Sequence, residues 1–226
     1  LVTLNMIKDI KIDGLNVFFT IVLTTPACPM KEQMSMASEN AIKLLVNKDA
    51  VVHVNFTANT TSNRVNAKSV LKGVKNIIAV VSGKGGVGKS TVSANLALSL
   101  AAGGAKVGLM DADIYGPSQH IMFGIRGERP LMKDDGAGKG LIVPIEKFGI
   151  KVMSIGLLID EKQAVVWRGP MVSSAIKQFV SDVDWGELDY LVIDMPPGTG
   201  DIHLTIVQTV PVTGVIVVTT PQLVAL

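Results

Sequence analysis

From about residue 76 onward, apolar residues in this chain follow two alternating patterns. Mostly apolar runs of strand length, typical of strands buried on both faces of a sheet, fall at residues 76–81, 106–110, 150–155, 190–194 and 215–220. Apolar residues at helical spacing lie at residues 92–100, 171–180 and 202–210. This alternation predicts an α/β fold with a mostly parallel sheet and helices on both faces.

The first part of the chain has the pattern of a small α+β domain. Apolar and polar residues alternate up to Asp13-Gly14, a strong signal for a two-residue hairpin, and residues 15–23 are predicted to form the returning strand. Pro29 suits the first position of a helix, and apolar residues continue at helical spacing through residues 30–44. Residues 52–56 alternate again, which predicts a third strand.

These patterns divide the chain into two predicted domains. The α+β domain covers residues 1–66, residues 67–75 form a linker, and residues 76–226 form the α/β domain. Residues 116–149 are glycine-rich and mixed in charge, and we predict a long surface insertion there. The chain does not begin with Met, and residues 221–226 stop where a helix would start, so we expect a fragment of a longer protein.

Composition narrows the function classes. A net charge of +2 gives no argument for nucleic acid as a partner. No apolar run reaches the ~18 residues needed to cross a bilayer, so we expect no membrane partner either. The single cysteine excludes an internal disulfide and favours a reducing compartment, the cytoplasm.

The stretch between the first α/β strand and the first α/β helix fits the phosphate-binding pattern G-x-x-x-x-G-K-[ST]. Glycines lack a Cβ, so backbone N–H groups can approach phosphate oxygens, and the following helix adds the positive end of its dipole. Lys89 is expected to reach the β- and γ-phosphates of ATP, and the Ser90 hydroxyl to hold Mg²⁺. The flanking strand and helix argue against a glycine-rich turn that matches by chance. The predicted site residues are Gly83, Lys84, Gly85, Gly86, Val87, Gly88, Lys89, Ser90 and Thr91.

Lys84 is an additional lysine that an ordinary phosphate loop does not need. With it, the sequence resembles the deviant-Walker-A class of ATPases, which includes ParA, MinD, the nitrogenase iron protein and the Mrp/ApbC iron–sulfur carriers. The resemblance implies that Lys84 crosses a homodimer interface to the partner's nucleotide, and that hydrolysis is slow and depends on the dimer. The alternative is that Lys84 only adds positive charge near a phosphate.

Two predicted strands end in aspartate, at the edge of the sheet where ligands bind in open α/β folds. Residues 190–194 form an apolar strand ending in Asp194, the Walker B pattern, and we predict that Asp194 binds Mg²⁺ through water. In the following loop, the Gly198 amide is expected to sense the γ-phosphate. Helix capping or turn formation is the alternative role for Asp194.

The strand at residues 106–110 continues into Asp111-Ala112-Asp113. Alternation puts the two carboxylates on one side, facing the phosphate pocket. By resemblance, Asp113 would position or activate the attacking water and join Lys84 and Lys89 as a catalytic residue. The resemblance also implies that Asp111 supports Mg²⁺ or a lysine, with helix capping as the alternative.

Three stretches make the resemblance specific to the Mrp/ApbC branch: residues 111–118, 167–171 and 194–201. ParA and MinD do not usually carry these together. The N-terminal domain, marked by residues 24–29, is similar to the small iron–sulfur-assembly domain often fused in front of Mrp ATPases. The resemblance implies an ATP-hydrolysing homodimer that carries iron–sulfur clusters and transfers them to apoproteins, with assembly factors as further partners.

The family's cluster-binding C-x-x-C pair is not in this sequence, whose one cysteine is Cys28. Because a cluster is typically held by four cysteines, we expect no cluster ligand in this chain and place the pair beyond residue 226. Cys28 is either a reactive thiol at a helix N-terminus or a small buried hydrophobic residue.

Two other functions compete with the carrier hypothesis. A ParA/MinD-like positioning ATPase would need a basic patch or an amphipathic terminal helix, and neither is visible in this sequence. A nucleotide-gated, non-catalytic adaptor would bind partners through its N-terminal domain, with incidental hydrolysis that neither partner nor cluster changes.

Overall fold

The computed structural model describes residues 1–2, 4–23, 28, 30–58, 71, 73–134, 140–158, 169–222 and 225, with only the backbone for 169–173, 201 and 205. The chain forms two compact units, Leu1–Thr61 and Ser62–Leu226. Most of the expected linker at residues 67–75, and the quoted stretches at residues 24–27, 29 and 167–168, lie outside the described residues.

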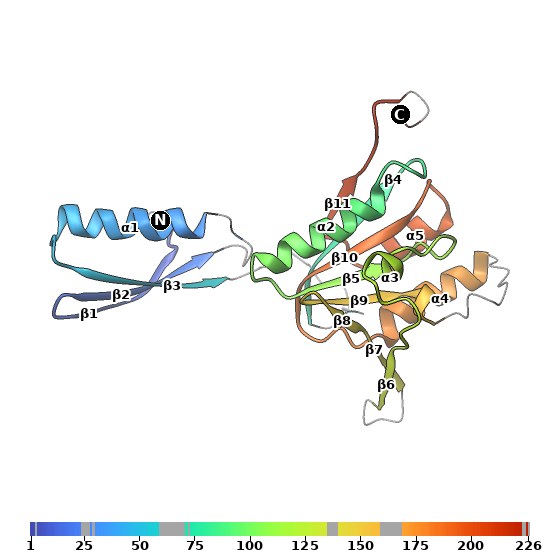
Figure 1. The fold of residues 1–226 in the computed structure, drawn as a ribbon, viewed down its shortest axis with the longest axis horizontal. Helices are drawn as coiled ribbons and strands as arrows, with labels where there is room; N and C mark the ends of the chain where they lie inside the picture. Colours follow the sequence, from blue (N-terminus) through green and yellow to red (C-terminus); the bar gives the residue numbers. More distant parts are fainter. Residues whose placement is uncertain are drawn as a thin grey trace. The chain divides into compact units, whose positions relative to one another are not determined.

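The N-terminal unit is a three-stranded sheet with one helix (Figure 1). The elements in chain order are β1 (Ile7–Asp13), β2 (Asn16–Leu23), α1 (Lys31–Leu45) and β3 (Val51–Ala58). β1 and β2 are antiparallel across a turn at Gly14, whose φ of 57° favours glycine, and β2 pairs with β3 in parallel. Phe19, Ile21 and Leu23 form the core, with Met34 and Ile42 of α1 packed against them.

The segment before α1 concerns two expectations. The helix begins at Lys31, with Met30 at the N-cap, and Pro29, expected at its first position, lies outside the described residues. Cys28 precedes the first helical turn and is half-buried against the core cluster around Phe19. Its surroundings therefore favour the packing alternative over a thiol placed at the helix N-terminus.

The second unit is built on a six-stranded sheet in the order β11-β4-β10-β5-β9-β8. Neighbouring strands are parallel except for the pair of β8 and β9, which is antiparallel. The strands are β4 (Val74–Ser82), β5 (Val107–Asp111), β8 (Ile145–Lys147), β9 (Ile150–Ser154), β10 (Leu188–Pro197) and β11 (Gly214–Val217). Because β10 lies between β4 and β5, three features share one edge of the sheet: the phosphate loop after β4, Asp194 near the carboxyl end of β10, and Asp111 at the end of β5. The expected strand at residues 190–194 thus continues past Asp194 to Pro197.

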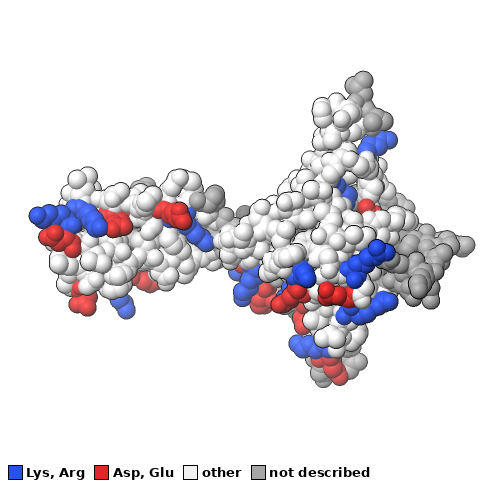
Figure 2. Space-filling view, in the orientation of Figure 1, with Lys and Arg blue, Asp and Glu red and all other residues white. Residues whose placement is uncertain are grey.

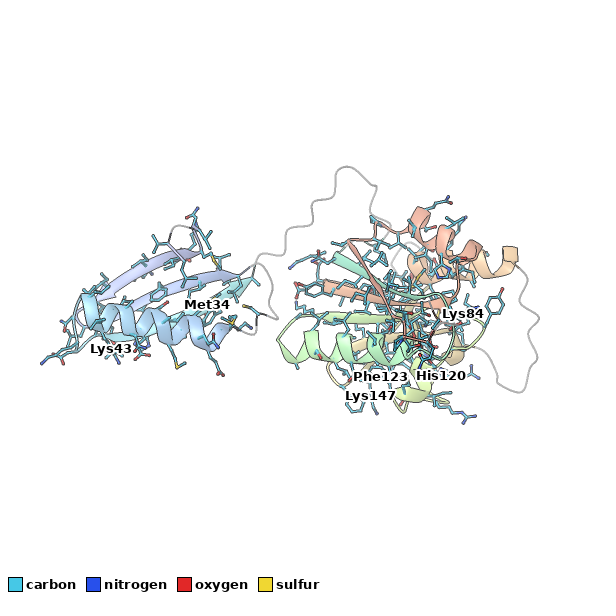
Figure 3. All side chains as sticks on the ribbon, turned by 90° about the horizontal axis from the view of Figure 1, so that it is seen from above. Met34, Lys43, Lys84, His120, Phe123 and Lys147 are labelled. Atoms are coloured by element: carbon cyan, nitrogen blue, oxygen red, sulfur yellow. The ribbon has the colours of Figure 1, made fainter. Side chains whose placement is uncertain are left out.

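Helices cover both faces of this sheet (Figure 3). α2 (Lys89–Ala102) packs on one face against β4, β5 and β10, while α4 (Gly169–Asp182) and α5 (Asp201–Thr209) lie together on the other. Leu191 and Ile193 point into the core under α4 and α5. These features confirm the predicted α/β fold with a mostly parallel sheet.

The expected surface insertion at residues 116–149 is wrong in part. It contains α3 (Gln119–Met122), a hairpin of β6 (Leu131–Asp134) and β7 (Gly140–Val143), and strand β8. Gln119, His120, Phe123 and Ile125 in and after α3 are buried. The glycines that suggested a loop include Gly124 and Gly127, which have positive φ and form turns between ordered elements.

Two further features are the apolar character of the helices and the distribution of charged residues on the surface. Among the described helices, none combines the length and apolar character that crossing a membrane requires. On the face that Figure 2 shows, lysines and arginines are interspersed with aspartates and glutamates in each unit.

Gly108 provides a test of the packing in the second unit. A Cβ added there would lie 2.8 Å from Leu188 Cδ1 and 2.9 Å from the ring of Trp185, which is buried. Gly108→Ala should therefore lower the free energy of unfolding by about 1–3 kcal/mol, the usual cost of overpacking a core. Denaturant titration measures the change. Gly214→Ala is the matched control, because a Cβ on that edge strand meets nothing within 4 Å. Equal midpoints for the two variants would contradict this description of the core.

Candidate functional site

The loop between β4 and α2 has the backbone of an anion-binding turn. Gly86 and Gly88 have φ values of 81° and 91°, which side chains rarely adopt. Gly88 is also the N-cap of α2 and provides no side-chain cap, so the first amides of the helix are left to other acceptors. A Cβ built on any of the loop glycines meets nothing within 4 Å. No atom of the described residues therefore blocks a phosphate group from approaching these glycines.

Lys89, the first residue of α2, is buried between two carboxylates. Its Nζ lies 2.5 Å from Asp194 Oδ1 and 3.9 Å from Asp113 Oδ2, and donates to Ser90 Oγ at 3.3 Å. The cation and both aspartates come from separate parts of the chain and meet at the end of the loop.

Asp194 lies at the centre of this cluster and has no exposed surface. Strand register places it opposite Val80 of β4 and Asp111 of β5. Besides Lys89, its carboxylate accepts hydrogen bonds from Ser93 Oγ at 3.0 Å and from Gln119 Nε2 at 2.7 Å. Asp194 therefore does not act as a helix cap or form a turn through its side chain, which were the alternatives to a ligand role.

Asp111 is also fully buried, and its carboxylate organises the start of α3. Oδ2 accepts hydrogen bonds from the backbone N–H groups of Ser118 and Gln119, each at 3.0 Å, and from Ser154 Oγ at 2.9 Å. These contacts are those of a helix cap, so they favour the capping alternative over support of Mg²⁺.

The environment of Asp111 changes its acidity. Burial raises its pKa to about 7, and the nearby Asp194 carboxylate acts in the same direction. The N–H groups of Gln119 and Ser118 and the Ser154 hydroxyl oppose this shift. A carboxyl group with this pKa is a poorer ligand for a hard cation at neutral pH than an ionised one.

Asp113 lies two residues further on, beside Lys89, and is 8% exposed. Burial raises its pKa, and the Lys89 cation is the main opposing influence. Oδ1 accepts a hydrogen bond from the Gly116 N–H at 3.2 Å, while Oδ2 faces Lys89 Nζ. This carboxylate thus has one oxygen tied to the backbone and one directed toward the loop.

The other predicted residues lie around the same loop. Lys84, labelled in Figure 3, and Thr91 are exposed, whereas Val87 and Ser90 are half-buried. Gly198 has a φ of 93° and donates its N–H to the Ser82 carbonyl oxygen at 2.8 Å, so its amide lies at the base of the phosphate loop. The roles of Lys84 and Gly198 toward a nucleotide remain predictions.

Sequence reasoning missed two side chains that contact Asp194. Ser93 is one helical turn after Lys89 and lies on the same face of α2, so helical spacing could have identified it. Gln119 lay inside the expected insertion, and the only local signal was the apolar run that follows it. Among the described residues, no group of three or more His, Cys, Asp or Glu side chains has the arrangement of a metal site. A divalent cation here would rely on Ser90, Asp194 and nucleotide phosphates, which is the usual set for Mg²⁺.

Comparison with known proteins agrees with this geometry. The family model for the NUBPL iron-transfer P-loop NTPase matches residues 73–226, and one for an iron–sulfur cluster assembly protein matches residues 1–56. An iron–sulfur cluster carrier protein from Synechocystis is 50% identical over the whole chain, and one from Escherichia coli is 55% identical over 74% of it. The chain spans 64% and 44% of the length of these two relatives.

A solved structure is also similar. A nucleotide-binding protein from Archaeoglobus fulgidus in complex with ADP is 42% identical, with a TM-score of 0.59 over 71% of this chain and 61% of its own. The family match to residues 73–226 includes the phosphate loop and β10 with Asp194. The chain therefore belongs to the NUBPL iron-transfer family of P-loop NTPases.

Proposed function

We propose that this chain is the ATP-hydrolysing part of an iron–sulfur cluster carrier, which binds clusters and transfers them to apoproteins. The observation that carries the proposal is the cluster of Lys89, Asp113 and Asp194 at the end of a glycine loop. The iron–sulfur cluster is proposed as the cargo because the carrier protein from Synechocystis is similar to this chain along its whole length. The unit formed by residues 1–61 would contact assembly factors, since its family model is that of an assembly protein.

The loop geometry suggests how ATP would be held. Backbone N–H groups around Gly86 and Gly88 would donate to the phosphates, and Lys89 would move its ammonium group from Asp194 to the β- and γ-oxygens. Ser90 and Asp194 would hold Mg²⁺, Asp194 through water. The metal ion would neutralise charge on the phosphate oxygens.

Asp113 is the residue best placed to orient water. Its Oδ2 faces the end of the loop, and the hydrogen bond from Gly116 to Oδ1 holds the carboxylate in that orientation. The raised pKa matches the role of a group that accepts a proton from water during attack on the γ-phosphate. We place Lys84 in trans: in a homodimer with two facing nucleotides, the exposed Lys84 of each subunit would stabilise charge on its partner's phosphates.

Lys89 tests the nucleotide site. Lys89→Gln keeps a donor for Asp194 but removes the cation, so affinity for a non-hydrolysable ATP analogue should fall about 10- to 100-fold, as expected for hydrogen bonds to charged groups. Isothermal titration of the full-length protein measures the affinity. Lys75→Ala is the matched control, because that lysine pairs with Asp189 at 2.8 Å, away from the loop. Equal affinity in the Lys89 variant and the control would refute the assignment of the loop.

A mixture of inactive subunits tests hydrolysis in trans. Lys84→Ala and Asp113→Ala should each bind nucleotide and lose most turnover. If Lys84 acts on the partner's nucleotide, a heterodimer has one site that lacks both groups and one intact site. An equal mixture should then regain about a quarter of wild-type specific activity, since about half of the dimers are mixed. Phosphate release measures the recovery. No recovery, in mixtures shown to contain heterodimers, would place Lys84 within its own subunit.

Cluster transfer tests the carrier function itself. The full-length protein, reconstituted with iron and sulfide, should transfer a cluster to an apoferredoxin. Cys28→Ser should leave bound iron and sulfide unchanged, because Cys28 packs against the N-terminal core and the cluster is expected to need ligands beyond residue 226. Absorption and circular dichroism of the acceptor follow the transfer. A full-length protein that holds no cluster would rule out the carrier function, and loss of the cluster in Cys28→Ser alone would make Cys28 a ligand.

A further inference from the structure

Gln119 is a polar side chain at the centre of the site whose presence the phosphate-loop pattern does not explain. It is the first residue of α3 and has no exposed surface. Its Nε2 donates to Asp194 Oδ2 at 2.7 Å and to the Ser90 carbonyl oxygen at 3.0 Å. One amide group therefore joins the two residues expected to hold Mg²⁺.

Gln119 binds a different oxygen of the Asp194 carboxylate from the one that Lys89 and Ser93 bind. Lys89 and Ser93 both donate to Oδ1, whereas Gln119 donates to Oδ2. If Lys89 moves to a phosphate, Ser93 and Gln119 remain to hold the carboxylate, one on each oxygen. The bond to the Ser90 carbonyl fixes the first turn of α2, which carries the Ser90 hydroxyl.

The position of Gln119 is itself determined by buried contacts of α3. The Asp111 carboxylate accepts hydrogen bonds from the backbone N–H groups of Ser118 and Gln119. On the following residue, the ring of His120 lies so close to Gly156 that a Cβ there would overlap it. These contacts hold α3 against β5 and the segment after β9. They thereby position the amide group of Gln119 next to Asp194.

A further atom of this side chain points to a ligand. Gln119 Oε1 is buried and has no hydrogen-bond partner in the part of the chain that the structure describes. A buried acceptor without a donor is costly. A water molecule on a cation next to Asp194 would supply that donor.

We propose that Gln119 is a positioning residue for the divalent cation: it orients Asp194 and the first turn of α2, and its Oε1 accepts a hydrogen bond from cation-bound water. This inference rests on the proposed nucleotide site and adds to it. Gln119 acts through Asp194 and Ser90, so its loss should weaken the effect of Mg²⁺ and leave the contacts of the loop to the phosphates intact.

The test is the Mg²⁺ dependence of binding of a fluorescent ADP analogue to the full-length protein. In Gln119→Met, which keeps the length of the side chain, the Mg²⁺ concentration for half-maximal enhancement of affinity should rise about tenfold, as expected for one hydrogen bond to a charged group. Affinity in EDTA should stay the same. Gln119→Leu is a second variant should the first fail to fold, as judged by thermal unfolding.

Two comparisons separate positioning from a merely structural role. Ser118→Ala removes a buried hydroxyl on the same segment, one that has no hydrogen-bond partner among the residues described, and should leave the Mg²⁺ dependence as in wild type. In an Asp194→Asn background, Gln119→Met should have little additional effect, because its partner is already changed.

The possible results lead to different conclusions. A wild type whose nucleotide affinity does not respond to Mg²⁺ would overturn the proposed site and this inference together. A normal response in wild type and an equal one in Gln119→Met would overturn only the role of Gln119. A loss of affinity that is the same in EDTA and in Mg²⁺ would overturn it too, since it would show a general disturbance of α3. A change confined to the Mg²⁺ dependence supports the proposal.

Discussion

The buried ion pair between Lys89 and Asp194 is the interaction on which the site depends. Moving two charges out of water costs several kcal/mol per ion by order of magnitude, and this is offset only when other hydrogen bonds satisfy the remaining atoms. Ser93 and Gln119 supply those bonds to Asp194. The pair is thus a charged centre held by polar neighbours, and it ties the start of α2 to the strand in the middle of the sheet.

Sheet order makes this pair possible. β10 lies between β4 and β5, so Asp194 lies beside both the phosphate loop and Asp111. A second polar layer then forms around Asp111, which holds the start of α3 and thereby places Gln119. The proposed cation site would therefore be supported from the ends of three neighbouring strands, β4, β10 and β5. A change at Asp111 would act on it through α3 without direct contact.

The two aspartates at the carboxyl end of β5 have different surroundings. Asp111, the last residue of the strand, is fully buried, while Asp113, two residues further on, retains some exposure and faces Lys89. Asp111 is used by backbone donors and Ser154, and Asp113 keeps one oxygen directed toward the loop. Their surroundings, rather than their residue type, make one a structural cap and the other a candidate for chemistry.

The sequence by itself determined the α/β fold, the phosphate loop and the two acidic strand ends, because these depend on local periodicity and on short motifs with fixed spacing. The assignments to Gln119 and Asp111 were decided only by the tertiary structure. Gln119 and Lys89 are 75 and 105 positions from Asp194, and no local pattern specifies that they meet. Glycine and charge made residues 116–149 resemble a loop, whereas Gln119 and His120 of α3 are buried and the His120 ring packs closely against Gly156. Contacts of this kind follow from strand order and packing, which the chain defines only as a folded whole.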